Sequence, residues 1–585
     1  MSNYWNKVEE LICPEKFELK NIEKTIHKKN LKITIGQLNF KVGDFENNNN
    51  KIMEAINEAH KAKSDLVIFS EMSLSGYYPW DLIERDLFWQ KQEKSLNKIL
   101  KLSQKLDIHI VLGLARKNNA AGKKYLNSLV VIYQGKIIFD YDKKLLPTYN
   151  VFDEKRHFEE GNKIGVWEGL STKIGFFICE DGWNDGENEY HLNPINELVI
   201  NGAELLIGIN ASPSNIYKME KREEIFKKIA VKYRKDIIYV NQVGAQDSIV
   251  FDGGSFFYNH QGESIYQAPQ FKEIVKSFYL NDLKQDHQYL SKEEFIFEQV
   301  CLGLSDYLRK NGFKKVVVGS SGGIDSALTL AIATLTLGYG NVTAIGMPGP
   351  FSSEGSIKDS IDLCKKLNIK FILHPISDQF GIAQENYLKN VKQEITGLAK
   401  ENLQARIRGQ ILMTFSNQNN AMVLSTGNKS ETSVGYCTLY GDSNGGLNLL
   451  GDLYKMEVYA LAKFINKRYG KAANDHSGNL IPESIINKAP SAELAPDQKD
   501  EDNLPPYDIL DTILYLAIEG ESLNKKEKIN LQKIVDSFEE KIKLKVYQLI
   551  DNAEYKRQQS PPIIRVHQLA FGVGRRIPIA HGLKF

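Results

Sequence analysis

The run VVVGSSGGIDSALTL, from Val316 to Leu330, decides the fold of the second half of the chain. It starts as a buried strand, turns through two glycines and continues as an apolar helix. Small residues in the turn let backbone N–H groups approach an anion, and the helix start adds the positive end of its dipole. An ordinary tight turn rarely needs the sequence S-G-G-x-D-S. The run therefore predicts a phosphate-binding loop, and it lacks the G-K-[ST] ending of loops that serve β,γ chemistry on ATP.

A second α/β pattern extends around this loop. Further apolar strands, NVTAIGM, KFILHP and AMVLST, alternate with helix-length segments. This rhythm is typical of a doubly wound parallel sheet, Rossmann-like in its layering. A helix predicted over Glu294–Arg309 precedes the loop, and the polar segment Leu280–Glu293 before it reads as a linker.

The first half of the chain carries a different α/β pattern. Short apolar runs recur, among them LKITIGQLN, DLVIF, IHIVLGL, KIGFFIC, ELLIGIN and DIIYVN, and helix-length segments such as 47–62 lie between several of them. Such a mixture favours a layered domain whose sheets are covered on both faces. We expect an N-terminal extension at 1–30, a first domain at 31–280, a linker at 281–293 and a second domain at 294–585.

Composition limits the kinds of partner. The 585 residues exceed what one hydrophobic core usually supports, so more than one domain is expected. The formal net charge is +1, from 74 basic and 73 acidic side chains, which provides no global field for nucleic acid or an anionic membrane. The stretch Tyr555–Phe585 is basic and carries no acid, and it reads equally as a solvated tail or a phosphate-binding segment. Small-molecule substrates fit this balance best.

The cysteines indicate a reducing compartment. Five of them are present, widely spaced and without a C-x-x-C pair, which argues against a disulfide framework and a structural zinc site. The N-terminal sequence MSNYWNKVEELICPEKFEL carries acids where a signal peptide needs a basic start and an apolar run. No 18-residue apolar stretch occurs. We expect a cytoplasmic protein with no membrane anchor.

Three predicted strand ends in the first half each carry a reactive side chain. Glu71 follows DLVIFS, Lys143 follows KIIFDYD, and Cys179 ends KIGFFIC. Catalytic groups of α/β folds gather on such loops. Cleavage of an amide by a thiol needs a base beside the sulfur, and it needs cationic or N–H donors aimed at the developing oxyanion. Glu71 and Lys143 supply one of each, and the backbone N–H of Glu180 is the expected second donor.

Five stretches around these residues carry a family resemblance. FSEMSLSGYYPWDL, DKKLLPTYNVFDEKRHF, GFFICEDGW, INASPSNIYKMEKRE and NQVGAQDSIVFDGGSFF occur in order, and together they resemble the glutaminase domain of the nitrilase superfamily as it occurs in NAD synthetases. The resemblance covers nearly all of 31–275 and implies an α-β-β-α sandwich. It implies that Cys179 is the nucleophile, Glu71 the general base and Lys143 the stabiliser of the tetrahedral intermediate. It also assigns Glu154 as the second glutamate, and it implies glutamine binding by Tyr149, Ser212 and Lys218.

Two positions depart from the simplest match. Ser70 stands where the family commonly has proline. Lys143 has a neighbour, Lys144, which an extended segment would point to the opposite side. The K-x-x-L-P spacing to Leu146 and Pro147 favours Lys143.

The second half carries its own resemblance. The glycine loop is similar to the pyrophosphate loop of N-type ATP pyrophosphatases, of the adenine nucleotide alpha hydrolase type, which cleave ATP between the α and β phosphates. The stretches ENLQARIRG, STGNKSETSVGYCTLYGD, GDLYKMEVYALAK and IPESIINKAPSAELAPDQKDEDNLPPYDILD resemble NAD synthetases throughout 293–585. The acid-rich Pro496–Asp502 reads by itself as a solvated loop, whereas the family places a cover over its site there.

The resemblance implies roles for named positions. Asp325 and Glu431 would hold Mg²⁺, whose ligands are oxygens, and Asn402, Glu431 and Lys556 would contact deamido-NAD. The positions implied to bind ATP are Gly319, Ser320, Ser321, Gly322, Gly323, Ile324, Asp325, Ser326 and Thr426.

Together the two halves predict one reaction. Ammonia released from L-glutamine would amidate deamido-NAD after ATP has adenylated its carboxylate, giving NAD, AMP and pyrophosphate. The resemblance further implies a homodimer or higher homo-oligomer built on the second domain. One alternative is another amidotransferase of this loop class, such as one making GMP, but its usual glutaminase has a Cys-His-Glu triad, and Cys179 has no G-x-C-x-G setting. A non-catalytic protein built on a dead enzyme is the other alternative.

Overall fold

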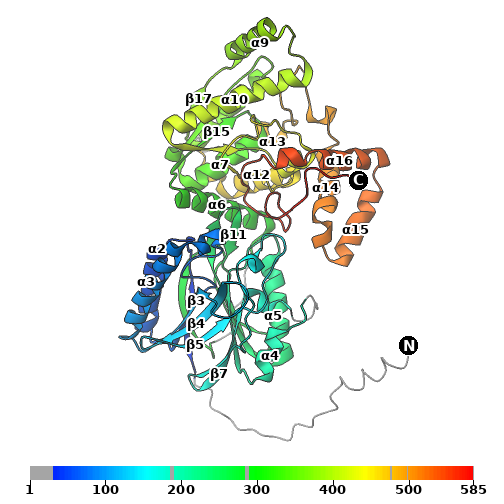
Figure 1. Cartoon of the computed structure of the whole chain (residues 1–585). Helices are drawn as coiled ribbons and strands as arrows, with labels where there is room; N and C mark the ends of the chain where they lie inside the picture. Colours follow the sequence, from blue (N-terminus) through cyan, green and yellow to red (C-terminus); the bar gives the residue numbers. More distant parts are fainter. Residues whose placement is uncertain (1–29, 185–189, 283–288, 475–476, 497, 584–585) are drawn as a thin grey trace, which may run out of the picture.

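The computed structural model describes residues 30–184, 190–282, 289–474, 477–496 and 498–583, so the predicted extension at 1–30 lies almost wholly outside the described residues. Two α/β units follow each other along the chain. The N-terminal unit, coloured blue through cyan into green, lies below the C-terminal unit, coloured green through yellow to red, in Figure 1. In the described part of the chain, no helix combines the length and the apolar character needed to cross a membrane.

The N-terminal unit contains two six-stranded sheets. The first has the order β14-β1-β2-β3-β4-β5 and the second the order β13-β12-β9-β8-β7-β6. The strands of the first are β1 (Lys32–Gln37), β2 (Leu66–Phe69), β3 (His109–Lys117), β4 (Tyr125–Tyr133), β5 (Lys136–Asp142) and β14 (Ile274–Tyr279). Those of the second are β6 (Val166–Gly169), β7 (Thr172–Ile178), β8 (Leu205–Asn210), β9 (Asp236–Asn241), β12 (Phe256–Tyr258) and β13 (Ser264–Gln267).

Strand β2 shows why these runs are apolar throughout. Leu66 and Ile68 belong to the cluster between the two sheets, whereas Val67 and Phe69 belong to the cluster under the helices of the first sheet. Successive side chains of a strand point to opposite faces, so a strand buried on both faces needs an unbroken apolar run. The helices are α2 (Phe45–Lys61) and α3 (Asp86–Ser103) on the first sheet, and α4 (Pro194–Ile200) and α5 (Lys218–Tyr233) on the second. The predicted α-β-β-α sandwich is confirmed.

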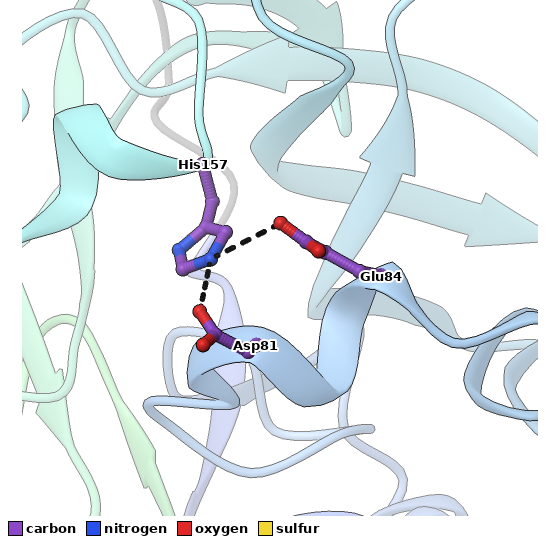
Figure 2. A group of neighbouring side chains, drawn as sticks. All are labelled: Asp81, Glu84 and His157. Carbon is purple, nitrogen blue, oxygen red and sulfur yellow. Dashed lines mark hydrogen bonds and ion pairs between the residues drawn. The ribbon is translucent and has the colours of Figure 1, made fainter.

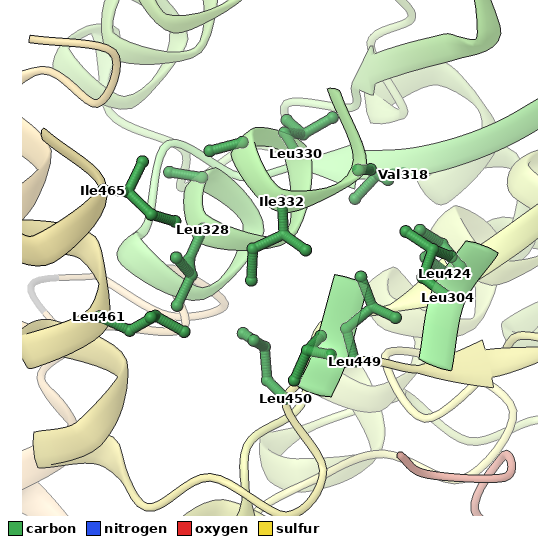
Figure 3. Close-up of a cluster of buried hydrophobic side chains, with 14 of the residues drawn as sticks. Leu304, Val318, Leu328, Leu330, Ile332, Leu424, Leu449, Leu450, Leu461 and Ile465 are labelled. Carbon is green, nitrogen blue, oxygen red and sulfur yellow. The ribbon is translucent and has the colours of Figure 1, made fainter. Parts of the chain in front are cut away.

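The C-terminal unit is built on a five-stranded parallel sheet of order β17-β16-β15-β18-β19. Its strands are β15 (Lys315–Ser320), β16 (Val342–Gly346), β17 (Lys370–Leu373), β18 (Ala421–Ser425) and β19 (Leu447–Asn448). Val316 and Val318 pack under α7 (Ile324–Leu337), and Val317 faces the opposite cluster, which includes residues of α10 (Gly397–Asn419). Figure 3 shows the first of these clusters, where α7 packs against β15 and α12 (Lys455–Tyr469). The predicted doubly wound sheet is confirmed.

Strand order places a binding site in this sheet. From β15 the chain builds outward through β16 and β17, and it then returns to the other side of β15 with β18 and β19. Ligands of open α/β sheets bind where the order reverses, beyond the carboxyl ends of the strands. The remaining helices of the unit are α8 (Glu354–Leu367), α9 (Ser377–Val391), α11 (Lys429–Val434), α13 (Glu483–Asn487), α14 (Tyr507–Glu519), α15 (Lys525–Asp536), α16 (Glu540–Asn552) and α17 (Glu554–Arg557).

One helix joins the two units. Helix α6 (Lys292–Asn311) begins two residues before the predicted Glu294, and the Ser291 hydroxyl accepts a hydrogen bond from the Glu294 N–H at its start. The helix packs on α7 and also on β10 (Val243–Gln246) and β11 (Ile249–Asp252) of the N-terminal unit. Asp306 accepts hydrogen bonds from Asn39 and from the Ala245 N–H, both at 2.7 Å. Helix α6 therefore packs against both units.

The basic C-terminal stretch also crosses between the units. Arg557 and Arg565 are buried, so the interpretation of this stretch as a solvated tail is wrong for them. The Arg565 N–H donates to the Ser248 carbonyl, and the Ile216 N–H donates to the Val566 carbonyl at 3.0 Å each. On the other side, Asp452 Oδ2 accepts the N–H groups of Val566 and His567, both at 2.7 Å. We call 563–569 the connecting segment.

Candidate active sites

Cys179 lies at a sharp turn after β7. It is the first residue of a short 3₁₀ helix, η3 (Cys179–Gly182), and its φ of 45° is in the left-handed region that side chains with a Cβ rarely adopt. Asp181 holds this turn against the loop after β5, because its carboxylate accepts the N–H groups of Ile178 at 3.0 Å and Leu145 at 2.8 Å. The strand end thus presents the thiol toward the loop that carries Lys143.

Lys143 lies between two buried glutamates. Its Nζ is 2.8 Å from Glu71 Oε1 and 2.7 Å from Glu154 Oε1, and all three side chains are almost fully buried. Asn127 donates to Glu71 at 2.7 Å, and Tyr77 donates to Glu154 at 2.7 Å. The three residues therefore form a rigid group, which we call the buried triad.

Electrostatics set the protonation of this group. Burial opposes the charge on Lys143, but Glu154 and Glu71 outweigh it and raise the pKa of the lysine well above its usual value. Burial raises the pKa of Glu154 to about 7, against the lowering effect of Lys143. Burial also raises the pKa of the Cys179 thiol well above its usual value, and the charge of Glu71 adds to this. Both effects favour the protonated thiol over the thiolate.

The neighbouring lysine has a separate partner. Lys144 forms an ion pair with Glu197, and its backbone N–H donates to Asp181 at 3.1 Å. Of the two lysines, therefore, only Lys143, which the motif spacing favours, pairs with Glu71 and Glu154.

A second group of polar side chains borders Cys179. Tyr149 donates to both oxygens of Glu180 at 3.1 Å, and Tyr190 donates to one of them at 2.9 Å. The Nζ of Lys218, the first residue of α5, lies 3.8 Å from the ring centroid of Trp183. Burial, together with Arg222 and Lys221, lowers the pKa of Lys218 to about 7. An acid and a base side by side complement the ammonium and carboxylate of an amino acid.

Ser212 contacts this region through hydrogen bonds of its backbone N–H and carbonyl groups. Its N–H donates to the Asn241 side chain at 2.9 Å, and its carbonyl accepts from Arg222 at 3.1 Å. Arg222 is itself buried and paired with Asp252 at 2.8 Å. This network fixes the loop after β8 in place beside the thiol.

The glycine loop joins β15 to α7 as the sequence predicts. Gly322 has a φ of 75°, and a Cβ there would stand 2.4 Å from the Ser356 carbonyl oxygen, so only glycine fits. The Ser320 hydroxyl is buried and has no hydrogen-bond partner among the described residues. A free donor of this kind fits an anion in the loop.

A cavity of about 370 Å³ opens beside this loop. It is lined by Gly319, Ser320, Ser321, Gly323, Ile324, Asp325, Ser326, Asn402, Thr426, Glu431, Lys455, Asp500 and Lys556, among others. Every predicted position of the second half is in this lining except Gly322, which lies within the loop. Asp500 is buried and accepts from Tyr507 at 2.8 Å, so the interpretation of Pro496–Asp502 as a solvated loop is wrong for this residue.

Asp325 and Glu431 both form ion pairs with a third residue, Lys455. Lys455 Nζ lies 2.6 Å from Asp325 Oδ2 and 3.1 Å from Glu431 Oε1, and we call these three residues the open triad because the cavity reaches them. Burial raises the pKa of Glu431 to about 8, and Asp325 adds to this, while Lys455 lowers it. Asn428 donates to Asp325 at 2.9 Å. Two carboxylates that share one ammonium ion are spaced for a cation with oxygen ligands, so the residues fit Mg²⁺.

The other predicted residues of the cavity make polar contacts inside the protein. Asn402, on α10, accepts from Thr438 at 2.6 Å. Lys556, on α17, donates to the carbonyls of Gly435 and Cys437 at 2.7 and 2.9 Å. Its charge is thereby held at the edge of the cavity.

Sequence reasoning missed several members of the two sites. Lys455 lies in the quoted stretch GDLYKMEVYALAK, so its motif was available, but a lysine at a helix start gives no sign of its partners. Glu180 was expected only as a backbone donor, although the tyrosines meet its side chain. Asn127 is one polar residue inside strand β4, and nothing local distinguishes it.

Comparison with known proteins agrees with the two-part architecture. A carbon-nitrogen hydrolase family model matches residues 32–286, and an NAD synthase model matches 296–560. The glutamine-dependent NAD(+) synthetase of Synechocystis is 40% identical, covering 94% of this chain and 98% of that protein. That of Acinetobacter baylyi is 37% identical, covering 95% and 99%.

A solved structure agrees over nearly the same length. The glutamine-dependent NAD+ synthetase of Acinetobacter baumannii, solved in complex with adenosine diphosphate, is 34% identical and superposes with a TM-score of 0.74 over 94% of this chain and 98% of that one. The chain therefore belongs to the family of glutamine-dependent NAD(+) synthetases.

Proposed function

We propose that the chain converts deamido-NAD, ATP and L-glutamine into NAD, with AMP, pyrophosphate and glutamate as the other products. One observation carries this proposal: a buried thiol beside a lysine and two glutamates occurs in the same chain as a phosphate loop with two convergent carboxylates. A chain that both releases ammonia and adenylates a carboxylate is suited to convert that carboxylate into an amide.

In the N-terminal half, the thiol of Cys179 attacks the side-chain amide carbon of glutamine. Glu71 takes the thiol proton as the C–S bond forms, and Lys143 stabilises the charge that develops on the amide oxygen. The N–H of Glu180 is the second donor to that oxygen. The amide nitrogen takes the proton back from Glu71 and leaves as ammonia when the tetrahedral intermediate collapses. Water then hydrolyses the glutamyl thioester to glutamate and the free thiol. Glu154 keeps Lys143 in position through its 2.7 Å ion pair.

The substrate's two charged ends fit the neighbouring side chains. Glu180, held by Tyr149 and Tyr190, suits the ammonium group, and Lys218 suits the carboxylate. Ser212 completes the pocket from the loop after β8. We propose that this pair of charges selects a free amino acid over a simple amide.

In the C-terminal half, the carboxylate oxygen of deamido-NAD attacks the α phosphorus of ATP, and pyrophosphate leaves. Ammonia then attacks the acyl carbon, and AMP leaves. Residues 319–326 and Thr426 bind ATP, and Asn402, Glu431 and Lys556 contact deamido-NAD. Magnesium, held by Asp325 and Glu431, would neutralise charge on the phosphates. Lys455 keeps the two carboxylates side by side.

We further propose the domain limits 31–280 and 294–585, with a linker at 281–293, a cytoplasmic location, and a homodimer or higher homo-oligomer formed through the second domain. The support for the oligomer is family membership. Light scattering at assay concentration tests it, and a fully active monomer would contradict it.

An isotope experiment tests the reaction itself. The chain is incubated with deamido-NAD, ATP, magnesium and glutamine labelled with ¹⁵N in its side-chain amide, and the NAD formed is analysed by mass spectrometry. We expect the label in the nicotinamide group and equal amounts of AMP and NAD. No NAD at all would support the GMP-type or non-catalytic alternatives, and turnover of ATP to ADP would contradict cleavage between the α and β phosphates.

A further inference from the structure

Two short 3₁₀ helices of the N-terminal unit meet outside the thiol site. Helix η1 (Trp80–Glu84) carries Asp81 and Glu84, and because a 3₁₀ helix has three residues per turn, both side chains lie on one side of it. Helix η2 (Glu154–Arg156) ends at His157. Figure 2 shows the imidazole of His157 directed at both carboxylates.

The three side chains are spaced as ligands of one ion. His157 Nε2 lies 2.9 Å from Asp81 Oδ1 and 3.8 Å from Glu84 Oε1, and the three ligand atoms all lie within 4.8 Å of one another. An ion about 2.1 Å from each ligand allows separations up to roughly 4.2 Å. Glu84 is 63% exposed, so a change of rotamer closes the remaining distance.

Tyr78 and Asp81 contact opposite nitrogens of the His157 ring. The Tyr78 hydroxyl lies 2.7 Å from Nδ1 and 3.3 Å from the Asp153 carbonyl. Nε2 lies 2.9 Å from Asp81 Oδ1, in a side chain only 2% exposed. Because Tyr78 occupies the Nδ1 side of the ring, Nε2 is the nitrogen directed at the two carboxylates and the one that would bind an ion.

We propose that Asp81, Glu84 and His157 bind a divalent transition metal ion, of which Zn²⁺ is the representative. One imidazole and two carboxylates suit Zn²⁺, whereas Mg²⁺ prefers oxygen ligands alone. Tyr78 supplies the outer hydrogen bond that fixes the ring of a metal-binding histidine. The ion displaces the proton of Nε2 and the exposed contact of Arg156 with Asp81, and water completes its coordination.

The site would tie η1 to η2. Tyr77, three residues before η1, donates to Glu154, the first residue of η2, so both helices already support the buried triad. A metal bridge between them adds a cross-link on the outer side of the same region. We therefore expect Zn²⁺ to stabilise the N-terminal unit, and this expectation is independent of the proposed reaction.

Calorimetric titration of the full chain with Zn²⁺, in millimolar Mg²⁺ to occupy oxygen-only sites, tests the proposal. Asp81→Asn and Glu84→Gln change exposed side chains, so both variants should fold. Glu160→Gln is the matched control, because Glu160 is an exposed acid of the same region that pairs with Lys155. We expect each of the first two variants to weaken one Zn²⁺ site at least tenfold and the control to leave it unchanged. Equal affinity in all four proteins would overturn the proposal.

Two further measurements separate this site from cysteine binding. Co²⁺ in place of Zn²⁺ should give visible bands without a sulfur charge-transfer band, and Asp81→Asn should remove them. Four of the five tryptophans, Trp80, Trp89, Trp167 and Trp183, lie in the N-terminal unit and none lies after position 183, so the fluorescence of these four follows the N-terminal unit. Zn²⁺ should raise its thermal midpoint in the wild type and not in an Asp81→Asn, Glu84→Gln double variant. A sulfur band, or an equal rise in the double variant, would place the ion elsewhere.

Discussion

The buried triad and the open triad are the same arrangement in two environments. In each, one lysine ammonium lies between two carboxylates, at 2.8 and 2.7 Å in Glu71–Lys143–Glu154 and at 2.6 and 3.1 Å in Asp325–Lys455–Glu431. The carboxylates of the first are at most 1% exposed, and those of the second are 17% exposed and border a cavity.

The difference in burial determines whether each lysine can separate from its two carboxylates. Moving Lys143 away from Glu71 and Glu154 would leave two unpaired carboxylates in an apolar interior, which costs free energy. Lys143 is therefore a fixed cation, suited to a charge that appears and disappears next to it. Lys455 borders the cavity of about 370 Å³ beside the glycine loop, so its carboxylates are open to another cation. Two similar sets of ion pairs thus give a permanent electrostatic environment in one half and an exchangeable one in the other.

The largest predicted difference between the two halves comes from removing the thiol of Cys179. Cys179→Ala deletes the group that would form the glutamyl thioester, so glutamine-driven NAD synthesis should fall by several powers of ten. Synthesis from ammonium salt should stay close to wild type. Both rates are measured on one preparation. Glutamine-driven turnover in this variant would exclude Cys179 as nucleophile, and loss of both rates would show that the halves do not work separately.

A change in the open triad should have the opposite effect: NAD synthesis is lost and glutamine hydrolysis is kept. Asp325→Asn removes a charged ligand beside the phosphate loop and should lower NAD formation from glutamine and from ammonia alike, by about 10²–10³-fold if one preorganised charge contact is lost. Hydrolysis of glutamine should persist, measured as glutamate release. Normal ammonia-driven synthesis would contradict the placement of the metal at Asp325.

Stability should distinguish the two lysines. Lys143→Met leaves two buried carboxylates uncompensated and should lower the free energy of unfolding of the N-terminal unit by about 3–5 kcal/mol. Lys455→Met should cost the C-terminal unit less, because water reaches its carboxylates. Hydrogen exchange, read separately on peptides of β2 and α7, compares the two variants. Equal losses would mean that the difference in burial has no energetic consequence.

The smallest predicted effect is a pH dependence in the glutamine pocket. Burial lowers the pKa of Lys218 to about 7, so the side chain loses its charge as the pH rises through 7. If only the charged form binds the glutamine carboxylate, the KM for glutamine should rise by up to about tenfold per pH unit above 7. Lys218→Arg should flatten this rise. A KM that is constant from pH 6.5 to 8.5 in the wild type would remove Lys218 from the pocket.

Much of this architecture could be predicted because it is local. Apolar runs such as DLVIF fixed the strands, since a strand buried on both faces requires them. Gly322 could be expected at a positive φ because a turn between strand and helix demands it. Motif spacing could prefer Lys143 over Lys144, and in the structure Lys143 pairs with Glu71 whereas Lys144 pairs with Glu197.

The remainder depends on contacts between distant residues. Lys455 is 130 positions from Asp325, and no sequence period relates them. Buried positions in the basic C-terminal stretch look like solvated charges until the fold supplies their acceptors, as Ser433 and Ile550 do for Arg557. Asp500 looked exposed in its acid-rich run for the same reason.

The connecting segment has a consequence for how the molecule is made. Its Gln568 carbonyl accepts from Asn150, the residue after Tyr149, although 418 positions separate the two. During synthesis the N-terminal unit leaves the ribosome first, and at about 5–20 residues per second its loop would wait tens of seconds for this contact. The glutaminase loops of a nascent chain thus acquire their final support only after the synthetase sheet has been translated. The protein is therefore assembled in a fixed order. The N-terminal half, which would release ammonia, is completed only by the connecting segment, and that segment is translated after most of the C-terminal half, which would consume the ammonia.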